Sequence, residues 1–271
     1  MDDKLESTEP FPGYRSACIQ KVTAMLITFP LPMEVIDLDQ PAPVLPPDLE
    51  REVERIWQEA SAQDAPRLFN GQIFSLDESI GNPPRGRFIE YRRFYAQFRH
   101  PELFSELKVR ALSVCAVVVT DEGVVWGQRG ADSAQKPGCW ELIPCGAVDP
   151  ASRTLERRLD LRTQILCELS EELGLRSEQL GEATPIAFFT DTTHHIHFYA
   201  FKLLTRLSMA EITSAFERGA PREHSRLRIV PHAELDRFVS TDALELSEVS
   251  RHLLTKAGLL EGFGDDGQLI T

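Results

Sequence analysis

The sequence predicts an α+β fold in which a mixed β-sheet lies between helices and is preceded by a smaller α+β unit. Apolar, β-branched runs alternate with segments of helical periodicity along the chain. The chain has 271 residues, of which 42% are hydrophobic and 26% charged, as in ordinary globular proteins. Strands and helices mixed in this order favour a sheet covered by helices over an all-helical or all-strand fold.

The first part of the chain predicts the smaller unit. Residues 1–22 are expected to be a mobile lead-in, and the unit then spans residues 23–108. TAMLITF has strand character, PAPVLPPDLE is a proline-rich connector, and a helix is expected from Asp48. RLFNGQIFSL and RGRFIEYRRF are interpreted as two strands around a Gly/Pro-rich turn, and HPELFSELK as a short helix.

Residues 109–271 predict the larger domain. LSVCAVVVTDEGVVWGQRG is typical of a hairpin, and PGCWELIPCGAV is a further strand that ends at Gly146. PIAFFTDTTHHIHFYAFKLL indicates two strands or one long hairpin. Around them we expect helices in LCELSEELGL, AEITSAFERG, PHAELDRFV and LELSEVSRHLLTKAG, and a strand in LRIVP.

The helix in LCELSEELGL carries an unusual charge cluster. Glu168, Glu171 and Glu172 are spaced i, i+3 and i+4, so they lie on one face of a helix. Like charges so close repel one another unless a cation lies between them, and carboxylates are ligands that Mg²⁺ prefers. A solvated acidic face is the ordinary alternative. The helix-ending Gly174 and the upstream strand tip at Gly146 favour a metal site.

Composition and charge exclude several classes of function. The formal net charge of −13 argues against a non-specific nucleic-acid binder, which needs clustered Lys and Arg. The apolar run VTAMLITFPLPMEVI is interrupted by prolines and too short to span a membrane, so no membrane partner is expected. The five cysteines are odd in number and form no CxxC pair. Reduced thiols and a cytoplasmic location are therefore expected.

These residues resemble the Nudix box, G-x5-E-x7-R-E-U-x-E-E-x-G-U with U aliphatic. Residues 168–175 match its second half at every constrained position, and Gly146 matches its first glycine. There are two departures. Cys167 stands where the family has an arginine that helps to position the carboxylates. Seven extra residues precede the helix, and they leave Glu156 or Asp160 as alternatives for the first glutamate of the box.

The longer chain is similar to the UDP-sugar diphosphatase branch of that family. The similarity runs from Thr23 to Gly258 and includes ITFPLPMEVI, IWQEASAQDAPRLFNGQIFSL and EYRRF. It implies a Nudix α/β/α sandwich that hydrolyses UDP-glucose or UDP-galactose to UMP and a hexose 1-phosphate, with Mg²⁺ or Mn²⁺. Two alternatives stay open. One is a diphosphatase for another nucleoside diphosphate derivative such as ADP-ribose, and the other is a catalytically silent nucleotide-binding domain.

The resemblance also implies site residues. Glu168 and Glu172 would ligate the metal, with Glu171 close by as a further ligand or catalytic group, together with the main-chain carbonyl of Cys145. The implied substrate-binding residues are Phe69, Tyr91, Arg129, Glu141, Asp149 and Ser247. Taken alone, the aromatic residues among them would more often belong to a core, and Arg129 could equally be a surface residue.

A proton acceptor outside the metal cage is expected in REHSRLRIVPHAEL. Glu223 precedes a late strand there and is predicted to be the general base. His224 and Glu217 are alternatives, and a solvated loop position is the bland interpretation of Glu223. A histidine has an ordinary pKa closer to neutrality and could do the same work.

Two further groups of residues are interpreted as ordinary. Alternation on a strand would send His195 and His197 to one face and His194 to the other. No cysteine or carboxylate pair completes a zinc set, so these histidines are expected to be surface or substrate-lining residues. The extra arginines before the glutamate helix are expected to form a solvated face and not to bind phosphate; they are Arg153, Arg157, Arg158 and Arg162.

Overall fold

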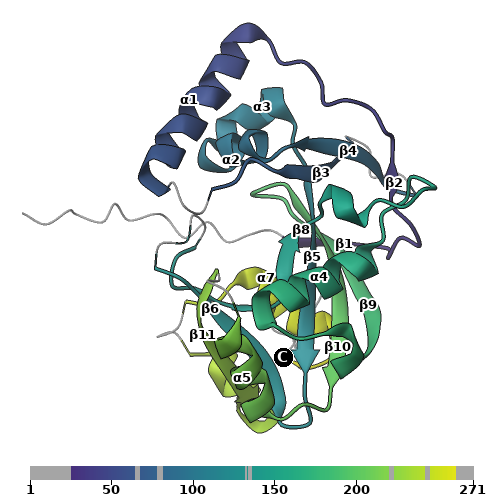
Figure 1. The fold of residues 1–271 in the computed structure, drawn as a ribbon, viewed down its shortest axis with the longest axis vertical. Helices are drawn as coiled ribbons and strands as arrows, with labels where there is room; N and C mark the ends of the chain where they lie inside the picture. Colours follow the sequence, from purple (N-terminus) through teal and green to yellow (C-terminus); the bar gives the residue numbers. More distant parts are fainter. Residues whose placement is uncertain are drawn as a thin grey trace, which may run out of the picture.

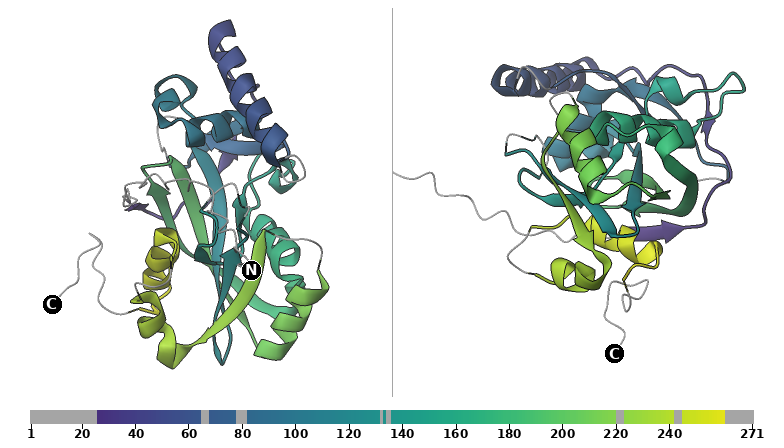
Figure 2. Two further views of the ribbon diagram at one scale, coloured as in Figure 1. Left: turned by 90° about the vertical axis from the view of Figure 1, so that its left-hand side faces the viewer. Right: turned by 60° about the horizontal axis from the view of Figure 1, so that its bottom comes forward.

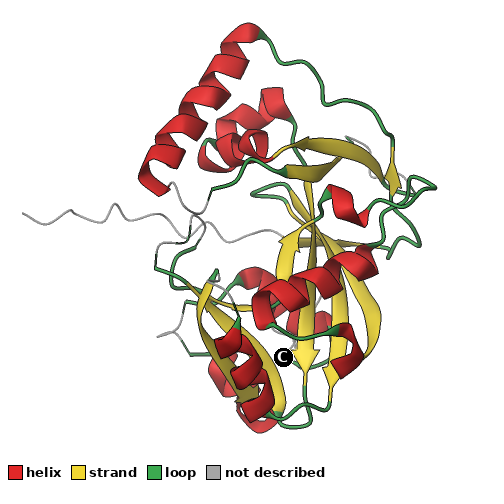
Figure 3. Ribbon diagram, viewed as in Figure 1, coloured by secondary structure: helices red, strands yellow, loops and turns green. Residues whose placement is uncertain are grey.

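The computed structural model describes residues 26–64, 68–77, 82–131, 133, 136–219, 223–241 and 245–260. The expected lead-in, residues 1–22, lies outside these ranges. Figures 1 and 3 show helices on both faces of one curled, mixed sheet, which confirms the predicted α+β class. No helix in the described ranges is long and apolar enough to cross a membrane.

Eleven strands of the described chain belong to the sheet. They are β1 (Leu26–Phe29), β2 (Ile36–Asp37), β3 (Gln72–Leu76), β4 (Arg85–Glu90), β5 (Ala111–Val119), β6 (Gly123–Arg129), β7 (Trp140–Leu142), β8 (Cys145–Ala147), β9 (Leu180–Asp191), β10 (Ile196–Thr205) and β11 (His224–Pro231). The main order is β1-β9-β10-β5-β3-β4-β2, while β8 pairs with β5 and β6 pairs with β11, β5 and β7. β5 and β10 run parallel, and β1 pairs antiparallel with β9.

The helices confirm most of the expected segments. They are α1 (Pro47–Asp64), α2 (Tyr91–Arg99), α3 (Phe104–Leu107), α4 (Leu161–Leu173), α5 (Met209–Arg218), α6 (Leu235–Val239) and α7 (Glu248–Lys256), with the short 3-10 helices η1 (Pro101–Leu103), η2 (Pro150–Ser152), η3 (Ser177–Gln179) and η4 (His232–Glu234). The prediction that all of RGRFIEYRRF forms a strand was wrong for its last four residues. The strand β4 ends at Glu90, and the helix α2 begins at Tyr91. Rings of Trp57 on α1 and Tyr95 on α2 meet edge to face at 5.7 Å and join the two helices.

The hairpin expected in LSVCAVVVTDEGVVWGQRG forms at its turn and then opens. Thr120 closes the turn by accepting hydrogen bonds from the backbone N–H groups of Glu122 and Gly123. Only Val119 and Val124 are paired between β5 and β6. Beyond them β5 pairs with β8 and β10, while β6 pairs with β7 and β11. The two strands therefore belong to different parts of the curled sheet.

The two faces of β5 are covered by different helices. Leu112, Val114, Ala116 and Val118 pack in the same buried cluster as the apolar face of α4. The alternate residues Cys115, Val117 and Val119 pack in a second cluster with Leu253 and Leu254 of α7. The two views in Figure 2 agree with Figure 1 in placing α4 and α7 on opposite sides of the sheet. This arrangement buries both faces, as near-continuous apolar strands require.

The extra residues before α4 are tied to the N-terminal part of the chain. The Arg153 guanidinium lies 2.5 Å from the buried carboxylate of Asp37, and Arg157 and Arg158 pair with Asp39 and Glu34. Backbone hydrogen bonds join the same segments, from Leu159 to Val35 and from Asp37 to Arg157. The side chains of Arg153, Arg157 and Arg158 are nonetheless exposed, by 38%, 62% and 60%, so the expected solvated face is confirmed, with acidic partners on it. Arg162 is exposed, as expected.

Candidate active site

The carboxylate cluster lies on α4, whose ends are both capped. The Asp160 side chain accepts a hydrogen bond from the Thr163 backbone at the start, and Gly174 adopts the left-handed conformation at the end. Asp160 is therefore occupied as a cap, and Glu156, the other alternative for the first glutamate of the box, is exposed in the preceding loop. The apolar side of α4 is buried, so the glutamates are held at a fixed depth against the sheet.

The three glutamates differ in burial. Glu172 is buried, Glu168 is half-buried and Glu171 is exposed. Burial and, to a smaller extent, the neighbouring carboxylates raise the pKa of Glu168 to about 7 against an opposing hydrogen bond from Gln164. Cys167 is exposed and brings no positive charge to this face. The cluster therefore holds negative charge that the helix itself does not neutralise.

Gly146 on β8 provides the space for the Glu168 carboxyl group. A Cβ atom at position 146 would lie 2.2 Å from the Cδ atom of Glu168, which is far inside van der Waals contact. The glutamate can therefore rest against the backbone of β8 only because residue 146 has no side chain. This explains physically why the strand tip and the helix, separated in the sequence, act together.

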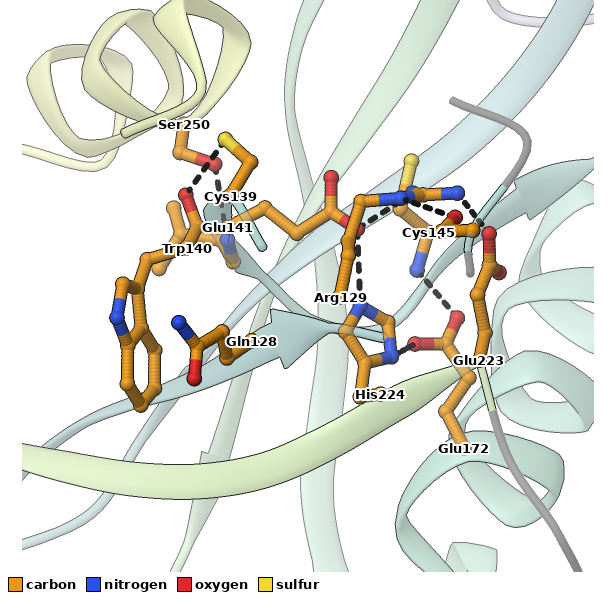
Figure 4. A network of polar contacts seen from close by, with 12 residues as sticks. Gln128, Arg129, Cys139, Trp140, Glu141, Cys145, Glu172, Glu223, His224 and Ser250 are labelled. Carbon is orange, nitrogen blue, oxygen red and sulfur yellow. Dashed lines mark hydrogen bonds and ion pairs between the residues drawn. The ribbon is translucent and has the colours of Figure 1, made fainter. Parts of the chain in front are cut away.

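Glu172 is held by groups from two other strands (Figure 4). One of its carboxylate oxygens accepts a hydrogen bond of 2.8 Å from the backbone N–H of Cys145. The other lies 3.2 Å from Nδ1 of His224, the first residue of β11. Nε2 of His224 lies 2.8 Å from the Glu141 carboxylate on β7. The imidazole thus lies between two carboxylates.

The same chain of charges continues to the surface (Figure 4). The guanidinium of Arg129 donates to Glu141 at 2.6 Å and also contacts Glu223. Negative and positive groups alternate along this path, from Glu172 through His224, Glu141 and Arg129 to Glu223. Each buried charge therefore has an opposite charge beside it, which a buried ion needs.

The side chain of His224 is almost fully buried, with an exposed fraction of 1%. Burial acts to lower its pKa, but hydrogen bonds and attraction from Glu141 and Glu172 outweigh burial and raise that pKa to about 9. Gly127 on β6 makes room for the ring, because a Cβ there would lie 2.7 Å from a ring carbon of His224. The imidazole is therefore a cation at neutral pH and cannot accept a proton.

A cavity of about 210 Å³ lies beside this network. Arg129, Glu141, Cys145 and Gly146 line one part of it, together with Glu223. Glu168, Glu171 and Glu172 do not line the cavity, but Gly146, which does, lies against the Glu168 carboxyl group. Another part is lined by Tyr91, Phe94 and Phe98, which all lie on α2. We call these three residues the aromatic wall.

The larger domain matches a known family. The family model of the NUDIX domain matches residues 109–253, which is more than half of the chain. This chain belongs to the Nudix family. No curated protein matches the chain in sequence. Family membership indicates a hydrolase that acts on phosphorus anhydrides and uses divalent metal ions such as Mg²⁺.

Several solved structures are similar to this Nudix chain. DR0079 from Deinococcus radiodurans is 16% identical, with a TM-score of 0.44, over 68% of this chain and 98% of its own. The MutT protein from Methanosarcina mazei is 18% identical, with a TM-score of 0.38, over 54% and 91%. The MutT Nudix hydrolase from Burkholderia pseudomallei is 23% identical, with a TM-score of 0.35, over 54% and 96%.

The Nudix carboxylates fit a hard divalent cation by their chemistry. They supply oxygen donors, and Glu168 rests in a space that a Cβ at Gly146 would fill. The raised pKa of Glu168 shows that negative charge is disfavoured there without a cation. Among the described residues, however, no three acidic, His or Cys side chains are gathered into a complete metal site. Glu172 is instead turned toward Cys145 and His224.

The structure brings some of the sequence-predicted site residues of this Nudix domain together and leaves others apart. The cavity gathers six of them, namely Tyr91, Arg129, Glu141, Cys145, Glu223 and Ser247. Phe69 does not line the cavity; it is 82% exposed, and its ring packs beside Gly71. Asp149 does not line it either and instead caps η2. Glu217 is exposed on α5.

The histidine segment differs from its expected arrangement. His194 and His195 lie in the turn between β9 and β10 and not on a strand, so strand alternation does not apply to them. His194 lines the cavity, whereas His195 stacks on Phe104 at 3.4 Å. His197 is buried and bonded to Thr190 at 2.6 Å. The expectation of a surface or substrate-lining position was therefore wrong for His197.

The sequence interpretation missed two features of the site. The first is the role of His224 as a buried cation. Its ring fits beside Gly127, and the sequence does not show that these two residues are neighbours. The second is the aromatic wall. Its residues Tyr91, Phe94 and Phe98 are spaced i, i+3 and i+7, which is the signature of one helix face. That spacing could have predicted the helix α2 and placed the three rings on one face of it.

Proposed function

We propose that this Nudix hydrolase splits the diphosphate of a nucleotide sugar, with UDP-glucose or UDP-galactose giving UMP and a hexose 1-phosphate. The observation that supports this proposal is the composite cavity. It is charged where Arg129, Glu141 and Glu223 line it and aromatic where α2 lines it. A nucleoside diphosphate derivative has the same division, because its diphosphate is anionic and its base is planar and largely apolar.

The charged part suits the diphosphate. We propose that Glu168, Glu172 and the main-chain carbonyl of Cys145 hold Mg²⁺ or Mn²⁺, with Glu171 beside them. When bound, such an ion supplies positive charge at the phosphoryl oxygens. Arg129 and Lys136 line the cavity and add cationic groups of the chain itself. These groups orient an anionic substrate that the net charge of −13 would otherwise repel.

Glu223 is proposed as the general base. It is nearly half-exposed, lines the cavity and is oriented by Arg129. In the reaction, water forms a bond to one phosphorus, the bridging P–O bond breaks, and the proton of water passes to the Glu223 carboxylate. His224 is not suited to this role because it already carries its proton near neutrality. Removing a general base typically costs about 100-fold to 10,000-fold in rate.

The proposal is tested by incubating the full chain with a panel of nucleotide sugars and Mg²⁺ and identifying both products. We expect kcat/KM for UDP-glucose or UDP-galactose to exceed that for ADP-ribose. A clear preference for ADP-ribose would select the alternative substrate class. Binding of UDP-glucose without any turnover would select the silent nucleotide-binding domain, for which the engagement of Glu172 by His224 would be the structural reason.

We also propose a domain boundary, a cellular setting and a partner for this protein. A unit boundary near residue 108 agrees with the start of the family match at residue 109. A reducing, cytoplasmic setting suits the free cysteines Cys115, Cys139, Cys145 and Cys167. The proposed partner is the small-molecule substrate, with neither nucleic acid nor membrane.

A further inference from the structure

The aromatic wall comes from outside the family domain. Tyr91, Phe94 and Phe98 precede residue 109, where the match to the Nudix family begins. The family domain closes the cavity on the other side with Phe198 of β10 and with the turn between β9 and β10. One part of the cavity is therefore shared between the α2 region and that turn.

The turn is docked on the α2 region by two stacked pairs of rings. The His194 ring lies 5.0 Å from the Phe98 ring at an angle of 30°. The His195 ring lies 3.4 Å from the Phe104 ring and is almost parallel to it. Of the two histidines, only His194 lines the cavity. The turn thus places one imidazole at the aromatic wall and uses its neighbour as an anchor outside the cavity.

Asp191 fixes the orientation and the tautomer of His194. Asp191 is buried, and its Oδ1 atom accepts hydrogen bonds from the backbone N–H groups of Thr193 and His194. Its Oδ2 atom lies 2.8 Å from Nδ1 of His194. Burial acts to raise the pKa of Asp191, but the hydrogen bond from His194 and the backbone bonds hold that pKa below its usual value. An ionised carboxylate only accepts, so Nδ1 carries the proton.

When the ring of His194 is neutral, its other nitrogen, Nε2, is an acceptor. In a neutral imidazole with a proton on Nδ1, Nε2 presents a lone pair. No hydrogen bond between described residues involves this atom, and a quarter of the side chain is exposed. A lone pair beside an aromatic wall complements a planar ring that has an N–H group on its polar edge. Uracil has such an imide N–H, whereas the matching nitrogen of cytosine and adenine carries a lone pair and would repel Nε2.

We propose that the aromatic wall, with the Asp191–His194 pair, is a base-binding subsite that selects a pyrimidine with an imide N–H. The inference rests on the proposed function, because it names which part of the nucleotide sugar occupies this part of the cavity. The wall provides stacking, which tolerates many bases, and His194 provides the discrimination, since a site built around a hydrogen bond rejects the analogue that lacks the donor.

The test measures binding and not hydrolysis. Calorimetric titrations of the full chain in EDTA compare UMP with N3-methyl-UMP, CMP and AMP. UMP is expected to bind about tenfold more tightly than N3-methyl-UMP, as the loss of one hydrogen bond implies. His194→Ala should remove this ratio. His195→Ala is the matched control, because it alters the same turn outside the cavity, and it should retain the ratio of the wild-type protein.

Several outcomes would overturn the subsite. Equal affinity of the wild-type protein for UMP and N3-methyl-UMP would overturn the subsite. This comparison needs no variant, so it stands even if His194→Ala fails to fold. A wild-type ratio that survives in His194→Ala also overturns it. AMP binding as tightly as UMP overturns the subsite but leaves a diphosphatase for another nucleotide. Conversely, a His194-dependent ratio in a protein that hydrolyses no nucleotide sugar supports the subsite and rejects the proposed function.

Discussion

Replacing Gly146 by alanine is expected to inactivate the site while leaving the fold intact. The new Cβ would lie 2.2 Å from Cδ of Glu168 and 2.3 Å from one of its oxygens. The carboxyl group must move by roughly 1 Å to reach ordinary contact, and a misplacement of about 1 Å in a catalytic site costs about 100-fold in rate. The displaced atoms are the far end of a flexible side chain, and φ of Gly146 is outside the left-handed region. The backbone can therefore accept alanine.

The matched control is Gly181→Ala on β9. A Cβ there meets its nearest atom, the carbonyl oxygen of Leu204, at 3.5 Å, which is ordinary contact. Both variants add one methyl group to a strand glycine, so any general effect on the backbone should be shared. The assay is kcat/KM for UDP-glucose with Mg²⁺, accompanied by thermal unfolding and by Mn²⁺ titration. Gly146→Ala should lose about 100-fold in kcat/KM with little change in Tm, and its Mn²⁺ affinity should fall.

The reasoning is refuted if Gly146→Ala keeps kcat/KM within about threefold of the wild-type value, or loses no more than Gly181→Ala. Either result would show that Glu168 works equally well away from the backbone of β8. A large fall in Tm for Gly146→Ala alone would also contradict the argument, because it would mean that the side chain cannot move aside.

Three further predictions follow from the charges of the site. The pKa of Glu168 is raised from an ordinary value of 4.5 to about 7 in the folded protein, so the metal-free protein should lose stability as the pH rises from 4.5 to 7. Glu168→Gln should abolish that slope in urea unfolding and should nearly abolish turnover. Glu223→Gln should lower kcat about 100-fold with little change in KM, whereas Glu217→Gln, on an exposed face, should change neither. His224→Gln removes the cation between two carboxylates and should lower the free energy of unfolding by about 3 kcal/mol. Because the pKa of His224 is raised from 6.5 to about 9, the advantage of the wild-type protein should be complete below pH 6.5 and should disappear as the pH rises through about 9.

The carboxylate helix was predictable because its signals are local. The spacing of the glutamates, the buried apolar side and the terminal Gly174 all lie within one segment, and the structure has α4 at that place. The hairpin of β9 and β10 was predictable for the same reason. In contrast, RGRFIEYRRF contains no Gly or Pro at the point where the strand β4 passes into the helix α2. The aromatic residues on both sides suit either state, so periodicity alone could not place the boundary.

The site itself depended on contacts between distant segments. The ring of His224 reaches Glu172 only because β11 lies beside β6 and residue 127 is a glycine. His194 meets Phe98 only because the β9–β10 turn docks on α2. Neither contact has a signal in the local sequence. Phe69 is the opposite case. The family resemblance of its segment predicted a substrate contact, but in the structure the ring is exposed and lies outside the cavity.

The pairing of β1 with β9 has a consequence for synthesis on the ribosome. Leu26 pairs with Asp191, so the first strand has no partner until roughly 165 further residues have been made. At about 5–20 residues per second, this interval is on the order of ten seconds or more. During that time Leu26–Phe29 is an apolar strand with unpaired backbone groups, the kind of segment that joins other chains. We therefore expect the yield of folded protein to depend on translation speed and on chaperones that bind nascent chains, even if the folded protein is stable.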